Sequence, residues 1–241
     1  TARGALAILT LVNLFNYLDR YVVSALVESL RQSELHPTDL QLRSLVTAFV
    51  VVYMAASPVF GVLGDRKRRP PLLGLGVAIW SVATADGGLA RSFLSLFAAR
   101  AAVGIGEASY GAVAPAMLAD AFPVERRGRV FAVFFCAIPI GSALGYVLGG
   151  WMDQRFGWRA AFLLAGAPGL ALAFLAARLA DPPRRDDRAP APPAAPERSA
   201  LARFAGIARI APYRRAVLGY AAYTFALGAL AFWTPAFLER V

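Results

Sequence analysis

Four ionisable side chains stand out because they lie inside long apolar stretches of the sequence. Arg100 and Glu107 are seven residues apart in one stretch, and Asp19 and Arg20 are adjacent in another. A spacing of seven places Arg100 and Glu107 on one face of a helix, about two turns apart. A charged side chain at the centre of a bilayer costs on the order of 3 kcal/mol or more. We therefore expect these four side chains to line a polar cavity or to pair with one another.

These residue types offer proton and anion chemistry. A carboxyl group in a cavity between helices can bind and release a proton, so Asp19 and Glu107 are predicted proton-coupling residues. A guanidinium group presents a planar fork that matches carboxylate or phosphate, which suits Arg20 and Arg100 for an anionic head group. A purely local pair between Asp19 and Arg20 is the alternative, but it would leave Arg100 and Glu107 unexplained.

Further polar residues share the helix face of Arg20. Asn13, Asn16 and Arg20 follow the spacing i, i+3 and i+7, which places them on one stripe of a helix. Asn16 is therefore a predicted substrate-binding residue beside Arg20.

The composition is that of a polytopic membrane protein. Of the 241 residues, 58% are hydrophobic, and the mean hydropathy is +0.55. The 25 Lys and Arg residues fall mainly between the apolar stretches, so the net charge of +10 indicates membrane topology and no nucleic-acid partner. One cysteine and one histidine provide no disulfide or metal-binding pattern. Since the sequence also has no nucleotide-binding loop or nucleophile–base pair, we expect no enzyme and no cofactor, with a proton gradient as the energy source.

Apolar stretches of about 20 residues predict seven membrane-spanning helices. They cover residues 5–29, 43–64, 71–90, 93–121, 128–152, 158–180 and 215–238. Residues 1–180 are thus predicted to form an N-terminal six-helix transmembrane bundle. Residues 181–212 form a Pro- and Arg-rich cytoplasmic linker that is extended between Asp181 and Ala200, and residues 213–241 begin an incomplete C-terminal bundle.

The distribution of basic residues predicts the orientation in the membrane. Seventeen Lys and Arg residues fall on the side of the N-terminus and the linker, six fall on the opposite side, and two are intramembrane. This bias places the N-terminus and the linker in the cytoplasm. The abundance of arginine over lysine hints at a bacterial source, so we expect the inner membrane. Six spans, a linker and a seventh span predict an all-α transporter of 6+6 helices whose second half is cut short at Val241.

A loop motif follows the second predicted span. Residues 61–69 read Gly-Val-Leu-Gly-Asp-Arg-Lys-Arg-Arg, which resembles the loop between the second and third helices of the major facilitator superfamily. The resemblance implies a bundle of inverted 3+3 repeats and a cytoplasmic conformational latch. Its predicted members are Gly61, Asp65, Arg66, Arg69, Asp120 and Arg127. Plain positive-inside topology would explain the arginines of this loop but not its aspartate and glycines.

Two further segments resemble the spinster branch of this superfamily, which includes lysophospholipid and sphingosine-phosphate transporters. They are Asn-Tyr-Leu-Asp-Arg at residues 16–20 and Arg-x-x-x-Gly-x-Gly-Glu-Ala-Ser-Tyr at residues 100–110. The resemblance implies the same roles for the two acids and the two arginines, and it adds Tyr17 and Tyr110 to the cavity wall. It also implies a hydroxyl residue after Tyr110, where this chain has Gly111 and departs from the family.

A ridge of glycines runs along the fifth predicted span. Gly141, Gly145 and Gly149 recur every four residues, which lets helices approach closely. This pattern is similar to the fifth-helix motif of superfamily antiporters, which implies a packing seam beside the cavity. Ordinary helix packing is an equal alternative.

The expected function is that of a proton-coupled secondary transporter that works by alternating access. The predicted substrate is amphiphilic and anionic, such as a lysophospholipid or a sphingoid-type lipid, because arginines and aromatic residues share an apolar cavity. A small organic anion or drug exchanger, or a non-transporting membrane receptor, are the alternatives. Expected partners are membrane lipids, the substrate and the C-terminal half of the same chain, in a monomer.

Overall fold

A computed structural model describes residues 1–184 and 200–238 of the chain. The described residues form helices and no strands. The chain divides into two units, Thr1–Arg188 and Ala189–Val241.

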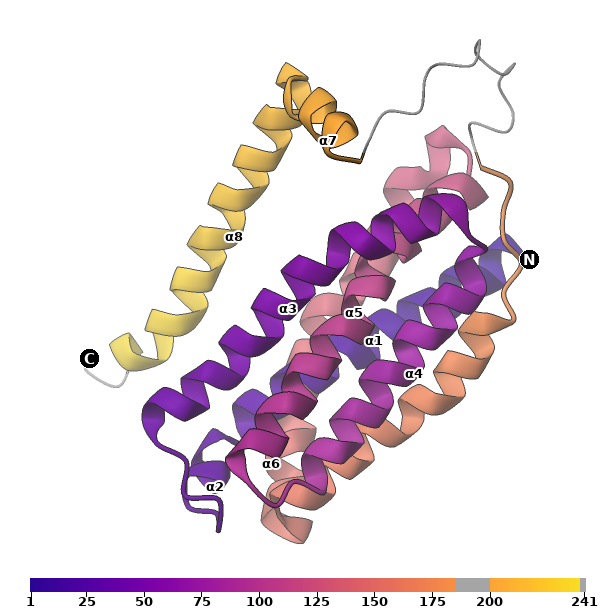
Figure 1. Cartoon of the computed structure of the whole chain (residues 1–241). Helices are drawn as coiled ribbons and strands as arrows, with labels where there is room; N and C mark the ends of the chain where they lie inside the picture. Colours follow the sequence, from indigo (N-terminus) through magenta and orange to yellow (C-terminus); the bar gives the residue numbers. More distant parts are fainter. Residues whose placement is uncertain (185–199, 239–241) are drawn as a thin grey trace. The chain divides into compact units, whose positions relative to one another are not determined.

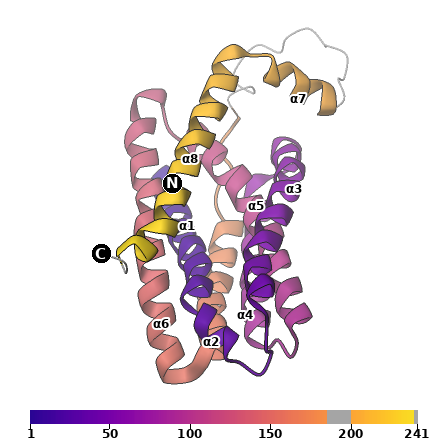
Figure 2. The same ribbon diagram turned by 90° about the vertical axis from the view of Figure 1, so that its left-hand side faces the viewer.

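The first unit is a bundle of long helices (Figures 1 and 2). Its helices are α1 (Ala2–Ala25), α2 (Val27–Arg31), α3 (Asp39–Arg66), α4 (Arg69–Gly88), α5 (Phe93–Ala121) and α6 (Val124–Ala177). Among the described residues, α1, α3 and α6 are long and apolar enough to cross a membrane. The predicted N-terminal bundle of six helices is confirmed: its long helices are α1, α3, α4, α5 and the two parts of α6, and α2 is a short helix of five residues.

The turn within α6 occurs at Gly157. Its backbone has φ of +79°, a conformation that glycine adopts without the steric cost that a Cβ atom would bring. The chain reverses direction there, so one part of α6 runs down the bundle and the other returns (Figure 2). The two parts correspond to the fifth and sixth predicted spans.

Local signals define where the other helices begin. Thr38 and Gln41 form a capping box at the start of α3, and Ser92 and Ser95 form one at the start of α5. Pro70 lies in the first turn of α4, where its missing N–H leaves no hydrogen bond unmade.

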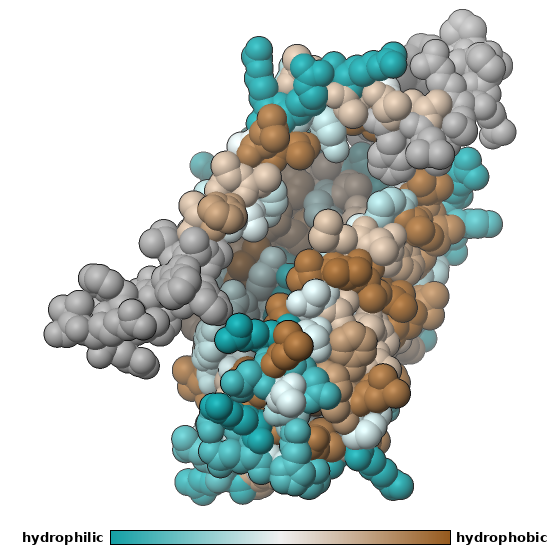
Figure 3. Space-filling view, turned by 60° about the vertical axis from the view of Figure 1, so that its left-hand side comes forward, coloured by the Kyte–Doolittle hydropathy of each residue, from teal (hydrophilic) through white to brown (hydrophobic). Residues whose placement is uncertain are grey.

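On the face that Figure 3 shows, many apolar side chains lie between two polar ends. Among the exposed apolar side chains of the bundle are Met54 of α3 and Val133 and Val147 of α6. Exposed apolar side chains of this kind suit contact with lipid acyl chains.

Glycines set the position of α5 between α3 and α4. A Cβ atom at Gly104 would lie 2.6 Å from the carbonyl oxygen of Phe49 in α3. One at Gly106 would lie 2.5 Å from the backbone nitrogen of Trp80 in α4. Only glycine allows these two backbone contacts, so the Gly-x-Gly pair holds α5 close to both neighbours, a few residues before Glu107.

A second seam joins α1 to the first part of α6. A Cβ atom at Gly145 would lie 2.5 Å from the carbonyl oxygen of Leu18, and one at Gly149 would lie 3.1 Å from the Cα atom of Val22. Gly141 faces the backbone of α1 one turn earlier. The glycine ridge therefore faces α1 directly beside Asp19 and Arg20, where the close approach requires residues without side chains.

Two apolar clusters fill the interior of the bundle. One contains Leu9 of α1 and Val103 of α5, and the other contains Leu18 of α1 and Leu96 of α5. Arg100 lies on α5 between Leu96 of one cluster and Val103 of the other. The ionisable side chains are thus surrounded by apolar packing.

The second unit contains α7 (Ala200–Ala208) and α8 (Ala211–Leu238). α8 covers the seventh predicted span. α7 is a short helix within residues 181–212, which the sequence analysis predicted as a linker, and most of the segment predicted to be extended lies outside the described residues.

Candidate functional site

Two ion pairs cross between α1 and α5. Arg20 of α1 contacts Glu107 of α5, with its Nε and Nη2 atoms 2.7 and 2.5 Å from Oε2. Arg100 of α5 faces Asp19 of α1, with 4.0 Å between Nη1 and Oδ2. The four predicted side chains therefore meet, and each acid pairs with the arginine of the other helix instead of the local Asp19–Arg20 pair.

Three of these four side chains are excluded from solvent. Asp19 is 0% exposed, Glu107 is 1% exposed and Arg100 is 4% exposed, while the side chain of Arg20 keeps 28% exposure. The hydroxyl of Thr84 in α4 donates a hydrogen bond of 2.8 Å to Oδ2 of Asp19. Asp19 is thus held from both α4 and α5.

Each acid has one buried oxygen that makes no hydrogen bond within the described part of the chain. These oxygens are Oδ1 of Asp19 and Oε1 of Glu107. Nε and Nη1 of Arg100 are also buried without a hydrogen bond among the described residues. Leaving a buried polar atom without a hydrogen bond costs about 1–3 kcal/mol, so such atoms favour binding of a proton or a polar ligand.

Aromatic rings surround the guanidinium group of Arg20. Its Cζ atom lies 5.0 Å from the ring centre of Tyr17, 4.8 Å from Phe49 and 5.5 Å from Tyr53. Phe49 also lies 5.4 Å from Cζ of Arg100, so one ring contacts both arginines. The ring faces attract the cations and restrict their positions.

Phe49 and Tyr53 belong to the candidate site, and sequence reasoning did not single them out. They lie one helical turn apart on α3, inside an apolar stretch that reads as an ordinary membrane span. Their aromatic i, i+4 spacing was the available signal, but lipid-facing aromatics show the same pattern.

A cavity of about 300 Å³ lies between α1 and α3, and both arginines line it. The other lining residues are mainly apolar: Tyr17, Tyr21, Val23, Ser24, Val27, Leu30, Leu42, Leu45, Val46, Phe49 and Val50. A few polar groups in an apolar wall are the usual composition of a small-molecule site, and the volume is at the lower end of the range for ligand pockets.

The predicted substrate-binding residues do not all reach this cavity. Tyr17, Arg20 and Arg100 line it. Tyr110 is 3% exposed and belongs to the apolar core, where its hydroxyl donates a 2.8 Å hydrogen bond to the carbonyl of Leu9. Asn16 is 2% exposed, and its Nδ2 atom makes no hydrogen bond among the described residues.

At the end of the bundle where α4 begins, Arg69 connects three helices. Its Nη1 atom lies 2.7 Å from Asp120 near the end of α5, and its Nε atom lies 2.8 Å from Asp181, which follows α6. Its backbone N–H also donates to Asp181, and Nη2 donates to the carbonyl of Pro182. Arg69 is 4% exposed, so this network is largely shielded from water.

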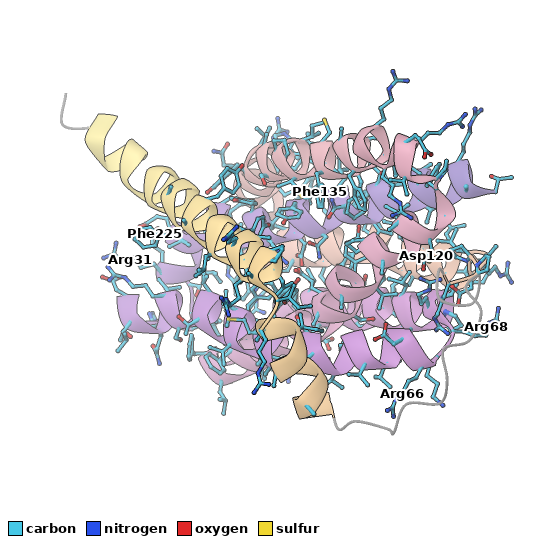
Figure 4. All side chains as sticks on the ribbon, turned by 90° about the horizontal axis from the view of Figure 1, so that it is seen from above. Arg31, Arg66, Arg68, Asp120, Phe135 and Phe225 are labelled. Atoms are coloured by element: carbon cyan, nitrogen blue, oxygen red, sulfur yellow. The ribbon has the colours of Figure 1, made fainter. Side chains whose placement is uncertain are left out.

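The other predicted latch residues lie outside the Arg69 network. Asp65 and Arg66 are exposed and make no ion pair among the described residues, and Figure 4 shows Arg66 projecting outward from this end. Arg127 donates to the carbonyl of Phe122 in its own connection. Nothing lies within 4 Å of a Cβ atom placed at Gly61.

Arg159 makes a corresponding connection at the opposite end of the bundle. Its Nη1 atom donates hydrogen bonds to the carbonyls of Gly88 (3.0 Å) and Ala90 (2.7 Å), at the end of α4. Its Nε atom donates to the Glu34 carboxylate at 3.0 Å. This hydrogen bond with Arg159 lowers the pKa of Glu34. Sequence reasoning used Arg159 only as a topology charge.

Comparison with known proteins identifies the family. The family model described as Major Facilitator Superfamily matches residues 9–241. The chain belongs to the major facilitator superfamily. It is 37% identical over 244 residues to human protein spinster homolog 1, covering 97% of this chain and 45% of that protein. It is 35% identical to the Drosophila melanogaster protein spinster, covering 96% of this chain and 38% of that protein. These relatives confirm the resemblance to the spinster branch.

Solved structures of superfamily members share the fold. A bacterial homologue of the human lysosomal transporter Spinster, in an inward-facing and unoccupied conformation, matches with a TM-score of 0.69 and 26% identity over 76% of this chain and 44% of that chain. The D-xylose–proton symporter matches with a TM-score of 0.58 and 21% identity, which shows a common fold. The chain spans less than half the length of the relatives named here.

Proposed function

We propose that this superfamily chain forms the N-terminal half of a proton-coupled secondary transporter for an amphiphilic anion, such as a lysophospholipid or a sphingoid phosphate. The main support is the pair of crossed ion pairs between α1 and α5, which lie beside a cavity that both arginines line. In this proposal the protein is a monomer of a bacterial inner membrane, and the Arg69 end of the bundle faces the cytoplasm.

The cavity chemistry supports the substrate class. Arg20 and Arg100 supply two positive charges at one place, where a phosphate or carboxylate head group can accept several hydrogen bonds. The rest of the wall is mainly aliphatic and aromatic, which suits an acyl or sphingoid chain. A small hydrophilic anion would use only the arginines and leave this apolar wall unused.

Competition for Arg20 would couple the anion to a proton. Glu107 and a bound anion need the same guanidinium group, since Nε and Nη2 of Arg20 both contact Glu107 Oε2. If Arg20 turns toward the anion, Glu107 becomes a buried carboxylate without a partner, which is strongly unfavourable. A proton then neutralises Glu107, so proton uptake accompanies anion binding. Asp19 faces Arg100 at 4.0 Å without a hydrogen bond, so the same competition would be weaker there.

The Arg69 network would supply the conformational latch. By joining the start of α4 to the ends of α5 and α6, it keeps one end of the N-terminal half together while the two halves of the transporter rock. Gly61, Asp65, Arg66 and Arg127 are proposed to contact the C-terminal half in one conformation.

Transport measurements test the coupling. The chain joined to its C-terminal half is reconstituted in liposomes, and uptake of a labelled lysophospholipid is followed with and without a pH gradient. Gradient-dependent uptake is expected in the wild type and should be lost in Glu107→Gln. It should persist in Glu28→Gln, which neutralises an exposed acid of α2. Equal uptake by wild type and Glu107→Gln, with or without the gradient, would overturn proton coupling.

The same preparation separates the alternatives. Uptake of a small organic anion without lipid uptake would favour an exchanger of small anions. Ligand binding that is independent of pH, with no flux of either substrate, would favour a receptor.

A further inference from the structure

Gly111 of α5 provides space for a side chain of α3. It lies four residues after Glu107, so the two share one helix face. A Cβ atom placed at Gly111 would collide with the hydroxyl oxygen of Tyr53 and lie 3.3 Å from its Cζ atom. Any other residue at position 111 would therefore force the Tyr53 ring to move.

The space above Gly111 brings the phenol of Tyr53 to the charge cluster. Its ring lies 5.5 Å from Cζ of Arg20, and its side chain interacts electrostatically with both Arg20 and Glu107. One turn earlier on α3, Phe49 contacts the same guanidinium group and lies 5.9 Å from the Tyr53 ring. Phe49 lines the cavity, whereas Tyr53 lies one helical turn beyond it. Tyr53 thus lies beside the guanidinium group of Arg20 but outside the cavity.

We propose that Tyr53 is a positioning residue that holds Arg20 on Glu107 until an anion binds, and that Gly111 is required to give its hydroxyl room. This role rests on the proposed anion and proton coupling. Without the phenol hydroxyl, Arg20 leaves Glu107 more readily, so Glu107 takes up a proton before any anion binds and proton uptake is no longer tied to anion binding.

A serine at position 111 of α5 is expected to replace the hydroxyl that Tyr53→Phe removes from α3. In Tyr53→Phe the atom that would collide is absent, and the nearest ring atom is then 3.3 Å from a Cβ atom at position 111. A serine fits there with a small adjustment and places its hydroxyl in the vacated space. In the presence of Tyr53, the same serine collides with the phenol.

The test compares Tyr53→Phe, Gly111→Ser and the double variant with the wild type, using the chain joined to its C-terminal half. Lysophospholipid uptake with a pH gradient is divided by uptake without one. We expect each single variant to lower this ratio by roughly threefold to tenfold and the double variant to recover most of it. Tyr146→Phe and Gly150→Ser are matched controls, because Tyr146 is exposed and nothing lies within 4 Å of a Cβ atom at Gly150.

Thermal unfolding of the same variants measures the shared space independently of transport. Gly111→Ser should lower the Tm of the wild type and leave that of Tyr53→Phe nearly unchanged. If gradient-dependent uptake is equal in the wild type and Tyr53→Phe, the role of Tyr53 is overturned while the proposed function stands. A lower uptake ratio in the double variant than in either single variant would overturn the role of Tyr53 as well. If the wild type shows no gradient-dependent uptake, the proposed function fails together with this role, while the Tm values still show whether the two residues exclude each other.

Discussion

Gly145→Ala tests how tightly α1 is held against α6. The new Cβ atom would lie 2.5 Å from the Leu18 carbonyl oxygen and 2.8 Å from Cβ of Tyr21, whereas ordinary contacts begin at 3.4 Å. The helices must therefore separate by about 0.9 Å at this point, because a backbone carbonyl cannot rotate away inside a helix. Overpacking of this kind costs about 1–3 kcal/mol.

This cost predicts a measurable loss of stability and of function. At 2–4 °C per kcal/mol, the Tm of the purified protein should fall by about 2–12 °C. Because Leu18 directly precedes Asp19 and Arg20, the same displacement should lengthen the crossed ion pairs and reduce gradient-dependent uptake. Gly150→Ala is the matched control, since a Cβ atom there meets nothing within 4 Å. Equal Tm values for the two variants would refute the tight seam.

Two further variants test the ends of the bundle. Arg69→Ala leaves Asp120 and Asp181 without their shared cation, so proteolysis in the segment after α6 should become faster and the Tm should fall by several degrees. At the opposite end, the pKa of Glu34 is lowered by Arg159, so this contact stabilises the protein above the ordinary Glu value of 4.5 and is lost as the pH falls through the folded-state pKa. The Tm of the wild type should therefore fall more steeply below pH 4.5 than that of Arg159→Gln.

Exposed arginines at the same two ends serve as controls. Arg68→Ala should leave proteolysis unchanged, and Arg155→Gln should keep the pH dependence of the wild type. Proteolysis of Arg69→Ala at the wild-type rate would show that the network does not hold the end of α6. Parallel Tm curves for wild type and Arg159→Gln would contradict the stabilising role of the Glu34 contact.

The helices of the bundle could be predicted from the sequence because their signals are local. An apolar stretch of about 20 residues is long enough to cross a membrane whatever its neighbours are. The turn of α6 at Gly157 also lies in a short polar interval between two such stretches. α7 is a different case, because it has only nine residues and lies beside a Pro-rich segment, so the sequence analysis assigned it to the linker.

The meeting of the four ionisable side chains was predictable from the sequence, but the pairing among them was not. Placing a charged side chain in lipid costs free energy, so Asp19, Arg20, Arg100 and Glu107 must have polar neighbours. This requirement follows from the residue types alone. Which arginine faces which acid depends on the rotation of α1 and α5, and a single step along a helix turns a side chain by about 100°. The close contacts at Gly104 and other glycines determine that rotation, and the sequence does not show which helix each glycine faces.

The Arg69 network was likewise predictable from the sequence only in part. Its pairing with Asp120 was among the predicted latch contacts, because the two residues lie in neighbouring connections on one side of the membrane. Asp181 was assigned to the linker, since only the return of α6 to α4 brings it to Arg69.

By itself, the sequence determined that this chain is an all-helical membrane bundle and which ionisable residues must be sheltered within it, because hydropathy and charge act on each segment independently. Only the tertiary structure decided that the ion pairs cross between helices, that Phe49 and Tyr53 enclose Arg20, and that Gly111 gives Tyr53 its place. These features depend on the angle and distance between packed helices, which are set by contacts between residues far apart in the chain.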